Sequence, residues 1–393
     1  MIQNKLHELM LLLICVLFIQ VGISFYLSFQ MLLFIYIFCL IFKLRNKKNI
    51  EVLMLLVVLF LLLSMSSYFS YYSWSTGDSL RAAREALCAF VLMLGTSSIF
   101  NKRFIFVNEG RTTIVRTFFL AILILLFVQV VFSKFGLFFN LSTDFFVINR
   151  PQFEASELYS LYGYQIRQSL TYGEPSYLSL IALGGALYSI PKIDIKLTII
   201  CFSIVLLTES TLGVLGIISM QALWFIEIKF GKNVALLSVF ISILILVVSL
   251  VIFKDDILDF KGMSAYIRIY APSYILGDVF SNHPFGISWN SMFDHFQNSL
   301  YGSIIGIGAF EQNFVGLDNG FLNLLYIYGY CGLIMYCIVF FFIYNNTTTI
   351  LCPFIYMLFS IQNGTIFSYD KVGLILFFYY IFRFQGLKKF ELV

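Results

Sequence analysis

The chain is short of charge and of histidine, and each shortage narrows what it can be. Asp, Glu, Lys and Arg make up 12% of its 393 residues, there are three histidines, and 60% of the residues are hydrophobic. A soluble protein of this length carries about 25% charged residues to cover its cores. The composition therefore excludes an ordinary soluble protein.

Two chemical signatures are missing as well. The seven cysteines lie in or at the ends of apolar segments without a Cys-x-x-Cys pair, so we expect neither a disulfide framework nor a zinc site. No Asp-x-Asp occurs, which leaves a metal-bound nucleotide donor unsupported, and we expect no metal and no cofactor. The net charge of +4 comes from short basic clusters between apolar runs, a pattern of membrane topology and not of nucleic-acid binding.

What the chain has is a series of apolar runs close to the length of a bilayer span, about 20 residues. We predict an all-α, polytopic integral membrane protein, with residues 1–393 forming a single membrane-embedded domain. A tight turn joins the first two runs, so eleven spans are possible instead of twelve, and we expect the first run to be retained and not cleaved as a signal peptide. The predicted spans are 9–25, 27–42, 52–70, 83–100, 113–133, 175–190, 197–209, 211–228, 234–253, 319–343, 350–362 and 368–383.

The basic residues predict how these spans are oriented. Loops rich in Lys and Arg stay in the cytoplasm, and the densest cluster runs from Lys43 to Lys48. Alternation from there places most of the 25 basic residues inside, together with both termini. Two long loops, about 134–174 and 254–317, then face outward. In a bacterium that side is the periplasm, where an enzyme must use substrates that are already activated.

The first outward loop contains Arg150 and Arg167 and ends at Glu174, before Pro175. A guanidinium binds phosphate oxygens in a bidentate manner, although Arg167 could instead pair with a carboxylate such as Glu157. Glu174 either favours the helix start at Pro175 through the helix dipole or has a functional role. An arginine followed by Gly-Glu-Pro-Ser-Tyr-Leu at the start of a span resembles the bacterial O-antigen polymerases, the Wzy proteins.

The second outward loop extends this resemblance. Arg268 is followed by His283-Pro-Phe-Gly, and Asp318-Asn opens a span that contains Gly329-Tyr-Cys-Gly332. This order is similar to the pattern shared by O-antigen polymerases and ligases: an arginine, a helix, His-Pro-x-x-Gly, a loop, and a His-Asn or Asp-Asn pair opening a span that ends in Gly-x-x-Gly. The resemblance covers about residues 150–335. The ligases and some polymerases have a histidine where this chain has Asp318.

The resemblance implies roles for individual residues, each beside a plainer alternative. Asp318 is a candidate general base, or the N-cap of a span that begins at Asn319. His283 and Asn319 are predicted glycan contacts, but His283 also suits packing at a helix end. Trp289 and His295 lie in an aromatic run that either lines a glycan path or packs the loop onto the membrane surface. Arg167, Arg268 and Arg150 are candidate ligands of a diphosphate, and Asp318 or Glu174 would act as the base.

Ionisable residues close to spans are the last candidates. Arg84 and Glu85 lie near the start of the fourth span, and Glu209 lies at the outer end of the seventh. Charges at such depth are costly and are often functional, unless the side chains extend to the interface.

The implied function is polymerisation of surface polysaccharide at the outer face of the bacterial inner membrane. The partner would be an undecaprenyl-diphosphate-linked oligosaccharide within membrane lipid, together with a chain-length regulator and a flippase of the same pathway. The first alternative is an O-antigen ligase that joins the glycan to lipid A–core, which Asp318 in place of histidine argues against. The second is a flippase or transporter, which would more often carry charges in the middle of its spans.

Overall fold

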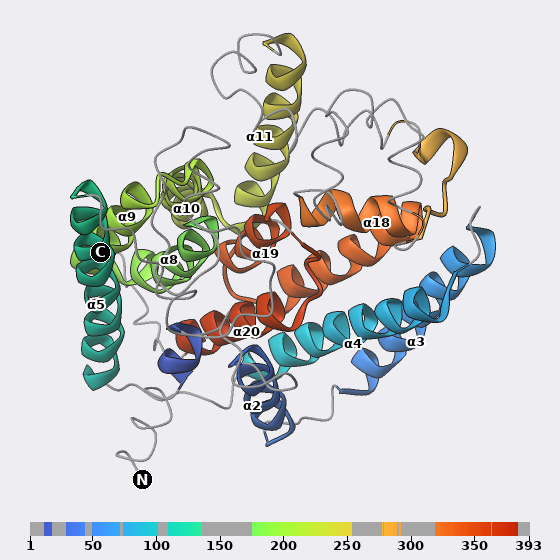
Figure 1. Cartoon of the computed structure of the whole chain (residues 1–393), viewed down its shortest axis with the longest axis horizontal. Helices are drawn as coiled ribbons and strands as arrows, with labels where there is room; N and C mark the ends of the chain where they lie inside the picture. Colours follow the sequence, from blue (N-terminus) through green and yellow to red (C-terminus); the bar gives the residue numbers. More distant parts are fainter. Residues whose placement is uncertain are drawn as a thin grey trace. The chain divides into compact units, whose positions relative to one another are not determined.

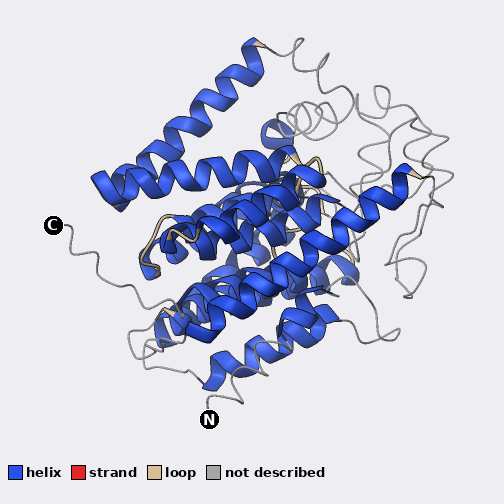
Figure 2. Ribbon diagram, turned by 90° about the vertical axis from the view of Figure 1, so that its left-hand side faces the viewer, coloured by secondary structure: helices blue, strands red, loops and turns tan. Residues whose placement is uncertain are grey.

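The long apolar runs fold as helices, which satisfy their backbone hydrogen bonds internally. The computed structural model describes residues 12–17, 29–43, 49–70, 74–100, 109–135, 175–253, 277, 279–288, 291, 319–362 and 364–383. In this part of the chain every regular element is helical and there are no strands (Figure 2). The all-α prediction is confirmed for these residues.

The predicted spans coincide with the helices, whose order is shown in Figure 1. Each segment from 27–42 onward overlaps one helix, and residues 12–17 of the first segment are helical. The helices are α2 (Phe29–Lys43), α3 (Asn49–Phe69), α4 (Thr76–Ile99), α5 (Glu109–Lys134), α8 (Pro175–Ser189), the 3₁₀ helix η1 (Ile190–Lys192), α9 (Ile195–Leu207), α10 (Thr211–Phe230), α11 (Lys232–Ile252), α18 (Gly320–Asn346), α19 (Leu351–Ile361) and α20 (Tyr369–Arg383).

Five of the described helices contain stretches long and apolar enough to cross a membrane. These stretches are Thr76–Ile99, Thr112–Phe132, Thr211–Phe230, Lys232–Ser249 and Gly320–Asn346. Shorter apolar helices occur at Met54–Phe69, Ile195–Leu207 and Leu351–Ile361. The chain thus has several helices compatible with a membrane protein, and the total of eleven or twelve crossings stays a prediction.

The outer surface of α11 shows why a membrane suits these helices. Leu244, Ile245 and Leu246 are 64%, 60% and 58% exposed, and most of the described residues of α11 are exposed. Exposed apolar area costs about 25 cal/mol per Å² in water, and lipid removes that cost.

The described residues cluster into two compact units. Unit 1 comprises residues 1–45, 95–229 and 369–393, and unit 2 comprises 46–94 and 230–368. The prediction of one membrane-embedded domain stays a prediction.

Unit 1 is built around α8, which is buried from Tyr177 to its end at Ser189, as are Ile190 and Pro191 of η1. Helices α5, α9 and α20 pack against it or against one another, and α2 packs on α20. A side chain at Gly184 would meet the Phe378 ring of α20 at 2.2 Å. The glycine therefore lets α20 approach α8 closely, as small residues do in membrane helix pairs.

Unit 2 is built around α18, which packs on α3 and α19. Buried residues fill the first half of α18 from Asn323 to Gly329. At Gly329 the helix has non-helical dihedral angles, φ 56° and ψ −135°, so α18 is kinked there. This bent half of α18 carries the features that follow.

Candidate functional site

Asn319 begins α18 as its N-cap. The Asn319 Oδ1 accepts hydrogen bonds from the backbone N–H groups of Phe321 and Leu322, both at 3.1 Å. This satisfies two of the donors that the first turn of a helix leaves free. The expectation that the span begins at Asn319 with Asp318 as its cap is therefore wrong by one residue, because Asn319 itself occupies the cap position.

Residues 283–288, which we call the His283 loop, lie against the kink of α18. The loop follows a helical turn at 279–282, and the Gly286 N–H donates to the His283 carbonyl at 2.8 Å. The Ile287 N–H donates to the carbonyl of Tyr326 at 3.2 Å, and the Tyr330 N–H donates to the carbonyl of Pro284 at 2.9 Å. Backbone groups of α18 at the kink therefore form hydrogen bonds with the His283 loop, whereas in a regular helix they would bond to other residues of the same helix.

Glycines make this approach possible. A Cβ on Gly329 would lie 2.1 Å from the Pro284 carbonyl oxygen, and one on Gly286, whose φ is 90°, would lie 2.1 Å from the Ile327 oxygen. Both residues have positive φ, which glycine adopts without steric cost. Two stretches far apart in the sequence, His283–Gly286 and Gly329–Gly332, are thus parts of one packed backbone arrangement, the glycine contact.

Helix α3 supports the other side of the His283 loop. The Ser66 hydroxyl donates to the Phe285 carbonyl at 2.7 Å, and the Ser70 hydroxyl donates to the Gly286 carbonyl at 3.2 Å. The rings of Phe69 and Phe285 pack at 4.9 Å between centroids. His283 is half-buried, and its proposed contact with glycan stays a prediction.

Helix α4 starts with a reciprocal cap and then buries a charge. The Ser75 N–H donates to the Asp78 carboxylate at 2.9 Å while the Asp78 N–H donates to the Ser75 hydroxyl at 3.2 Å, which is a capping box. One turn further, Arg81 Nε donates to Glu85 Oε1 at 3.0 Å. Glu85 is completely buried within the described part of the chain.

Tyr328 and Trp74 lie on one side of this ion pair's neighbourhood, as two linked contacts show. The Tyr328 hydroxyl of α18 lies close to the Glu85 carboxylate without meeting hydrogen-bond geometry, and Arg81 and Arg84 also act on it electrostatically. The Trp74 ring packs on the Tyr328 ring at 5.8 Å between centroids. We call these five residues (Trp74, Arg81, Arg84, Glu85 and Tyr328) the polar cluster.

Four buried atoms of the polar cluster have no hydrogen-bond partner among the described residues. They are Trp74 Nε1, Arg84 Nε, Glu85 Oε2 and Tyr328 OH. Buried polar atoms in folded proteins are almost always paired, so four in one neighbourhood require an explanation.

In unit 1 the polar groups at the start of α8 are paired. The Tyr177 hydroxyl donates to the Asp370 carboxylate at 2.6 Å, and the Ser210 hydroxyl donates to the Ser179 hydroxyl at 2.9 Å. Lys371 is 2% exposed beside them in sequence, whereas Glu209 is exposed at the turn between α9 and α10. Of the ionisable residues singled out from the sequence, Glu85 is therefore buried and Glu209 is not.

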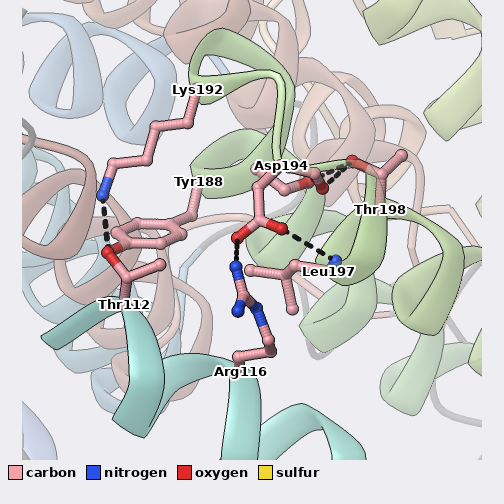
Figure 3. Close-up of polar contacts among 8 residues, drawn as sticks. Thr112, Arg116, Tyr188, Lys192, Asp194, Leu197 and Thr198 are labelled. Carbon is pink, nitrogen blue, oxygen red and sulfur yellow. Dashed lines mark hydrogen bonds and ion pairs between the residues drawn. The ribbon is translucent and has the colours of Figure 1, made fainter. Parts of the chain in front are cut away.

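A second polar group of unit 1 joins α5 to the α8–α9 connection (Figure 3). Arg116 pairs with Asp194 at 2.8 Å, and Asp194 also caps α9 by accepting the Leu197 N–H at 3.2 Å. The Lys192 ammonium donates to the Tyr188 hydroxyl at 2.7 Å and to the Thr112 hydroxyl at 3.2 Å. We call Thr112, Arg116, Tyr188, Lys192 and Asp194 the clasp, because their contacts fasten three helical segments together.

Most residues singled out from the sequence fall outside the described part of the chain. They are Arg150, Arg167, Glu174, Arg268, Trp289, His295 and Asp318. Sequence reasoning identified Arg84 and Glu85 but missed Arg81, Trp74 and Tyr328. The spacing of Arg81 and Glu85, four residues apart on one helix, was a readable signal of an ion pair.

In comparisons with protein-family models, curated proteins and solved structures, none matches this chain.

Proposed function

We propose that the chain is an O-antigen polymerase, a glycosyltransferase of the bacterial inner membrane. It would transfer a growing glycan from one undecaprenyl diphosphate to the terminal sugar of another lipid-linked repeat unit. In this proposal the two long loops face the periplasm, both termini lie in the cytoplasm, and all twelve apolar segments cross or enter the membrane.

One observation carries the proposal: the two motif stretches behind the resemblance meet in space. The His283 loop and the Gly329 kink share backbone hydrogen bonds to the Tyr326 carbonyl and from the Tyr330 N–H. Neither glycine tolerates a side chain at this contact. A His-Pro-x-Gly stretch and a Gly-x-x-Gly stretch that matched by chance would have no reason to pack on each other.

The proposed chemistry is attack of a sugar hydroxyl on the anomeric carbon of the donor glycan. The new bond joins the hydroxyl oxygen to that carbon, the bond from the carbon to the diphosphate oxygen breaks, and the lipid diphosphate leaves with the electron pair. The hydroxyl proton passes to a base, for which Asp318 and Glu174 are the candidates. Arg167, Arg268 and Arg150 are the candidates for stabilising charge on the leaving diphosphate.

A second candidate, a flippase for the same lipid-linked unit, is favoured by the depth of the polar cluster. Glu85 lies about 13 Å along α4 from Thr76, at 1.5 Å per residue, and it is completely buried with Arg81 as its partner. Charges within spans are typical of transport pathways.

A gel of surface polysaccharide from a deletion strain separates the candidates. Loss of a polymerase leaves lipid A–core that carries a single repeat unit, whereas loss of a ligase or a flippase leaves bare core. A ladder of normal length in the deletion strain would reject all three functions.

Single variants then test the proposed site. Arg167→Ala or Arg268→Ala should abolish long chains while the protein still accumulates in the membrane, and lysine at either position should restore them only in part, because it cannot bind phosphate in a bidentate manner. Arg116→Lys, in the clasp, is the matched control and should leave the ladder unchanged. Normal ladders in both alanine variants would remove the diphosphate role of these arginines.

A further inference from the structure

The polar cluster of unit 2 has the chemistry of a ligand site that the sequence did not assign. Glu85 is 0% exposed and Tyr328 is 1% exposed. The Glu85 Oε2 and the Tyr328 hydroxyl are both buried without a hydrogen-bond partner among the residues that the structure describes. Leaving such groups unsatisfied costs about 1–3 kcal/mol each, and more for a charged group, so a fold has no reason to collect them in one place.

The unpaired atoms define which ligand would satisfy them. Arg84 Nε, Trp74 Nε1 and the Tyr328 hydroxyl are donors, whereas Glu85 Oε2 is an acceptor. A phosphate oxygen accepts hydrogen bonds but does not donate them, and it would be repelled by Glu85. A sugar hydroxyl donates and accepts at once, so vicinal hydroxyls can satisfy both kinds of atom.

The aromatic ring beside Tyr328 favours the same ligand. The polar cluster itself holds two arginines and one glutamate, whereas the Asp78 carboxylate of the same helix is engaged by Ser75 in the capping box, so the test below includes a diphosphate without sugar. The Trp74 ring beside Tyr328 adds an apolar face, and aromatic faces stack on the apolar faces of sugar rings.

The cluster also lies within about three turns of the predicted outward ends of two helices. Helices α4 and α18 both start on the side that the basic residues predict to face outward. Tyr328 lies about 12 Å along α18 from Gly320, and Glu85 lies about 13 Å along α4 from Thr76. The His283 loop and Asn319 belong to the same end of unit 2.

We infer that the polar cluster binds hydroxyl groups of the glycan, with Glu85 accepting from one hydroxyl and with Arg84 and Tyr328 donating to its neighbours. This inference rests on the proposed function, because the proposal supplies the glycan. It adds a sugar-binding site to the arginine-based diphosphate site that the two long loops are proposed to form.

Binding to the purified protein in lipid nanodiscs tests the inference. One probe is the lipid-linked repeat unit extracted from a strain that lacks both this protein and the O-antigen ligase, and the other is undecaprenyl diphosphate without sugar. Glu85→Gln, Tyr328→Phe and Arg84→Lys each should weaken binding of the lipid-linked unit by about tenfold or more and leave binding of undecaprenyl diphosphate unchanged. Glu227→Gln in α10 and Tyr344→Phe near the end of α18 make the same chemical changes elsewhere and should alter neither affinity.

Each other result has a definite meaning. Unchanged affinity for the lipid-linked unit in all three variants would overturn the inference and leave a hydrated structural ion pair. Equal weakening with undecaprenyl diphosphate would overturn it in favour of a phosphate site. If Glu85→Gln fails to accumulate, Tyr328→Phe decides the outcome, because it removes a single oxygen. Failure of the proposed function appears in the polysaccharide gel of the deletion strain, as bare core or a ladder of normal length. Failure of the inference appears in the binding measurements, as a wild type that binds no lipid-linked unit or as variants that bind it with unchanged affinity.

Discussion

The two acid–arginine pairs of the described chain use their carboxylates differently. In the clasp, one Asp194 oxygen accepts a hydrogen bond from Arg116, and the other accepts from the Leu197 N–H at the start of α9. Both oxygens therefore stabilise the fold. Arg116 Nε is buried without a hydrogen-bond partner among the described residues, although the arginine side chain as a whole is 39% exposed. In the polar cluster, Glu85 Oε1 accepts from Arg81, and Oε2 is buried without a hydrogen-bond partner among the described residues.

This difference teaches how to separate structural from functional ion pairs within a membrane protein. A carboxylate whose oxygens both serve the backbone and a neighbouring helix is explained by stability alone. A fully buried carboxylate with an unsatisfied oxygen destabilises the fold. Such groups are found at functional sites, where a bound ligand supplies the missing hydrogen bond. The following variants test that contrast, from the largest expected effect to the smallest.

The largest effect is expected from Gly329→Ala, which disrupts the contact between the His283 loop and α18 next to Tyr328 of the polar cluster. The new methyl group would lie 2.1 Å from the Pro284 carbonyl oxygen, and alanine disfavours a φ of 56°. We expect a loss of more than about 3 kcal/mol of unfolding free energy and little folded protein in the membrane. Accumulation and thermal stability in detergent measure this.

Gly364→Ala provides the matched control for that variant. Gly364 also has a positive φ, 79°, but a Cβ there meets nothing within 4 Å. The variant should lose about 1 kcal/mol of unfolding free energy, because only the unfavourable positive φ destabilises it and no atom is displaced. Equal losses for the two glycines would show that the contact between the His283 loop and α18 does not support unit 2.

The next effect contrasts Glu85→Ala with Asp194→Ala. Removing Glu85 leaves Arg81 without its carboxylate in a buried setting, which costs about 3–5 kcal/mol. Removing Asp194 loses a helix cap and a pair whose arginine side chain is 39% exposed, which together cost about 1–2 kcal/mol. Unfolding in mixed micelles measures both. A larger loss for Asp194→Ala would reverse the contrast between the polar cluster and the clasp.

A third test compares the two N-caps, Asn319 of α18 and Asp194 of α9. Asn319→Ala should cost about 1 kcal/mol, whereas Asn319→Asp and Asp194→Asn keep a capping oxygen and should each change stability by less than about 0.5 kcal/mol. Because Asn319 is also a predicted glycan contact, its aspartate variant should shorten the polysaccharide chains. Asp194→Asn should not shorten them, and the ladder on a gel distinguishes the two. Normal chains from Asn319→Asp would leave Asn319 as a cap only.

Hydropathy predicted where the helices lie but not all of their ends. The fourth span was expected from residue 83, where the apolar run begins, yet α4 begins at Thr76. The extra turns are polar in sequence and become helical because the Ser75–Asp78 capping box starts them and because Glu85 is buried with its partner Arg81. The start of α18 was displaced by one residue, because Asp318 and Asn319 are both suitable caps and only geometry chooses between them.

The candidate site was less predictable than the fold. Glu85 was recognisable as a charge at a span, but Tyr328 reads as one aromatic residue among many in an apolar helix. What makes it notable is its position beside Glu85 and Trp74, and that position depends on the Gly329 kink and its contact with Gly286. A long-range contact between two backbones leaves no periodic trace in the sequence, because hydropathy records burial and not the partner.

The smallest effect is expected from Tyr188→Phe in the clasp. The change removes a hydroxyl that accepts from Lys192 at 2.7 Å and lies 3.1 Å from the Thr112 hydroxyl. The ring stays beneath the Lys192 ammonium, 4.0 Å from its centroid, so the cation–π contact survives. We expect a loss of about 0.5 kcal/mol in unfolding free energy and a polysaccharide ladder of normal length. Tyr328→Phe removes the same atom from the polar cluster, so a shortened ladder from Tyr328→Phe together with a normal one from Tyr188→Phe would separate ligand binding from stability, and a shortened ladder from both would place the clasp in function as well.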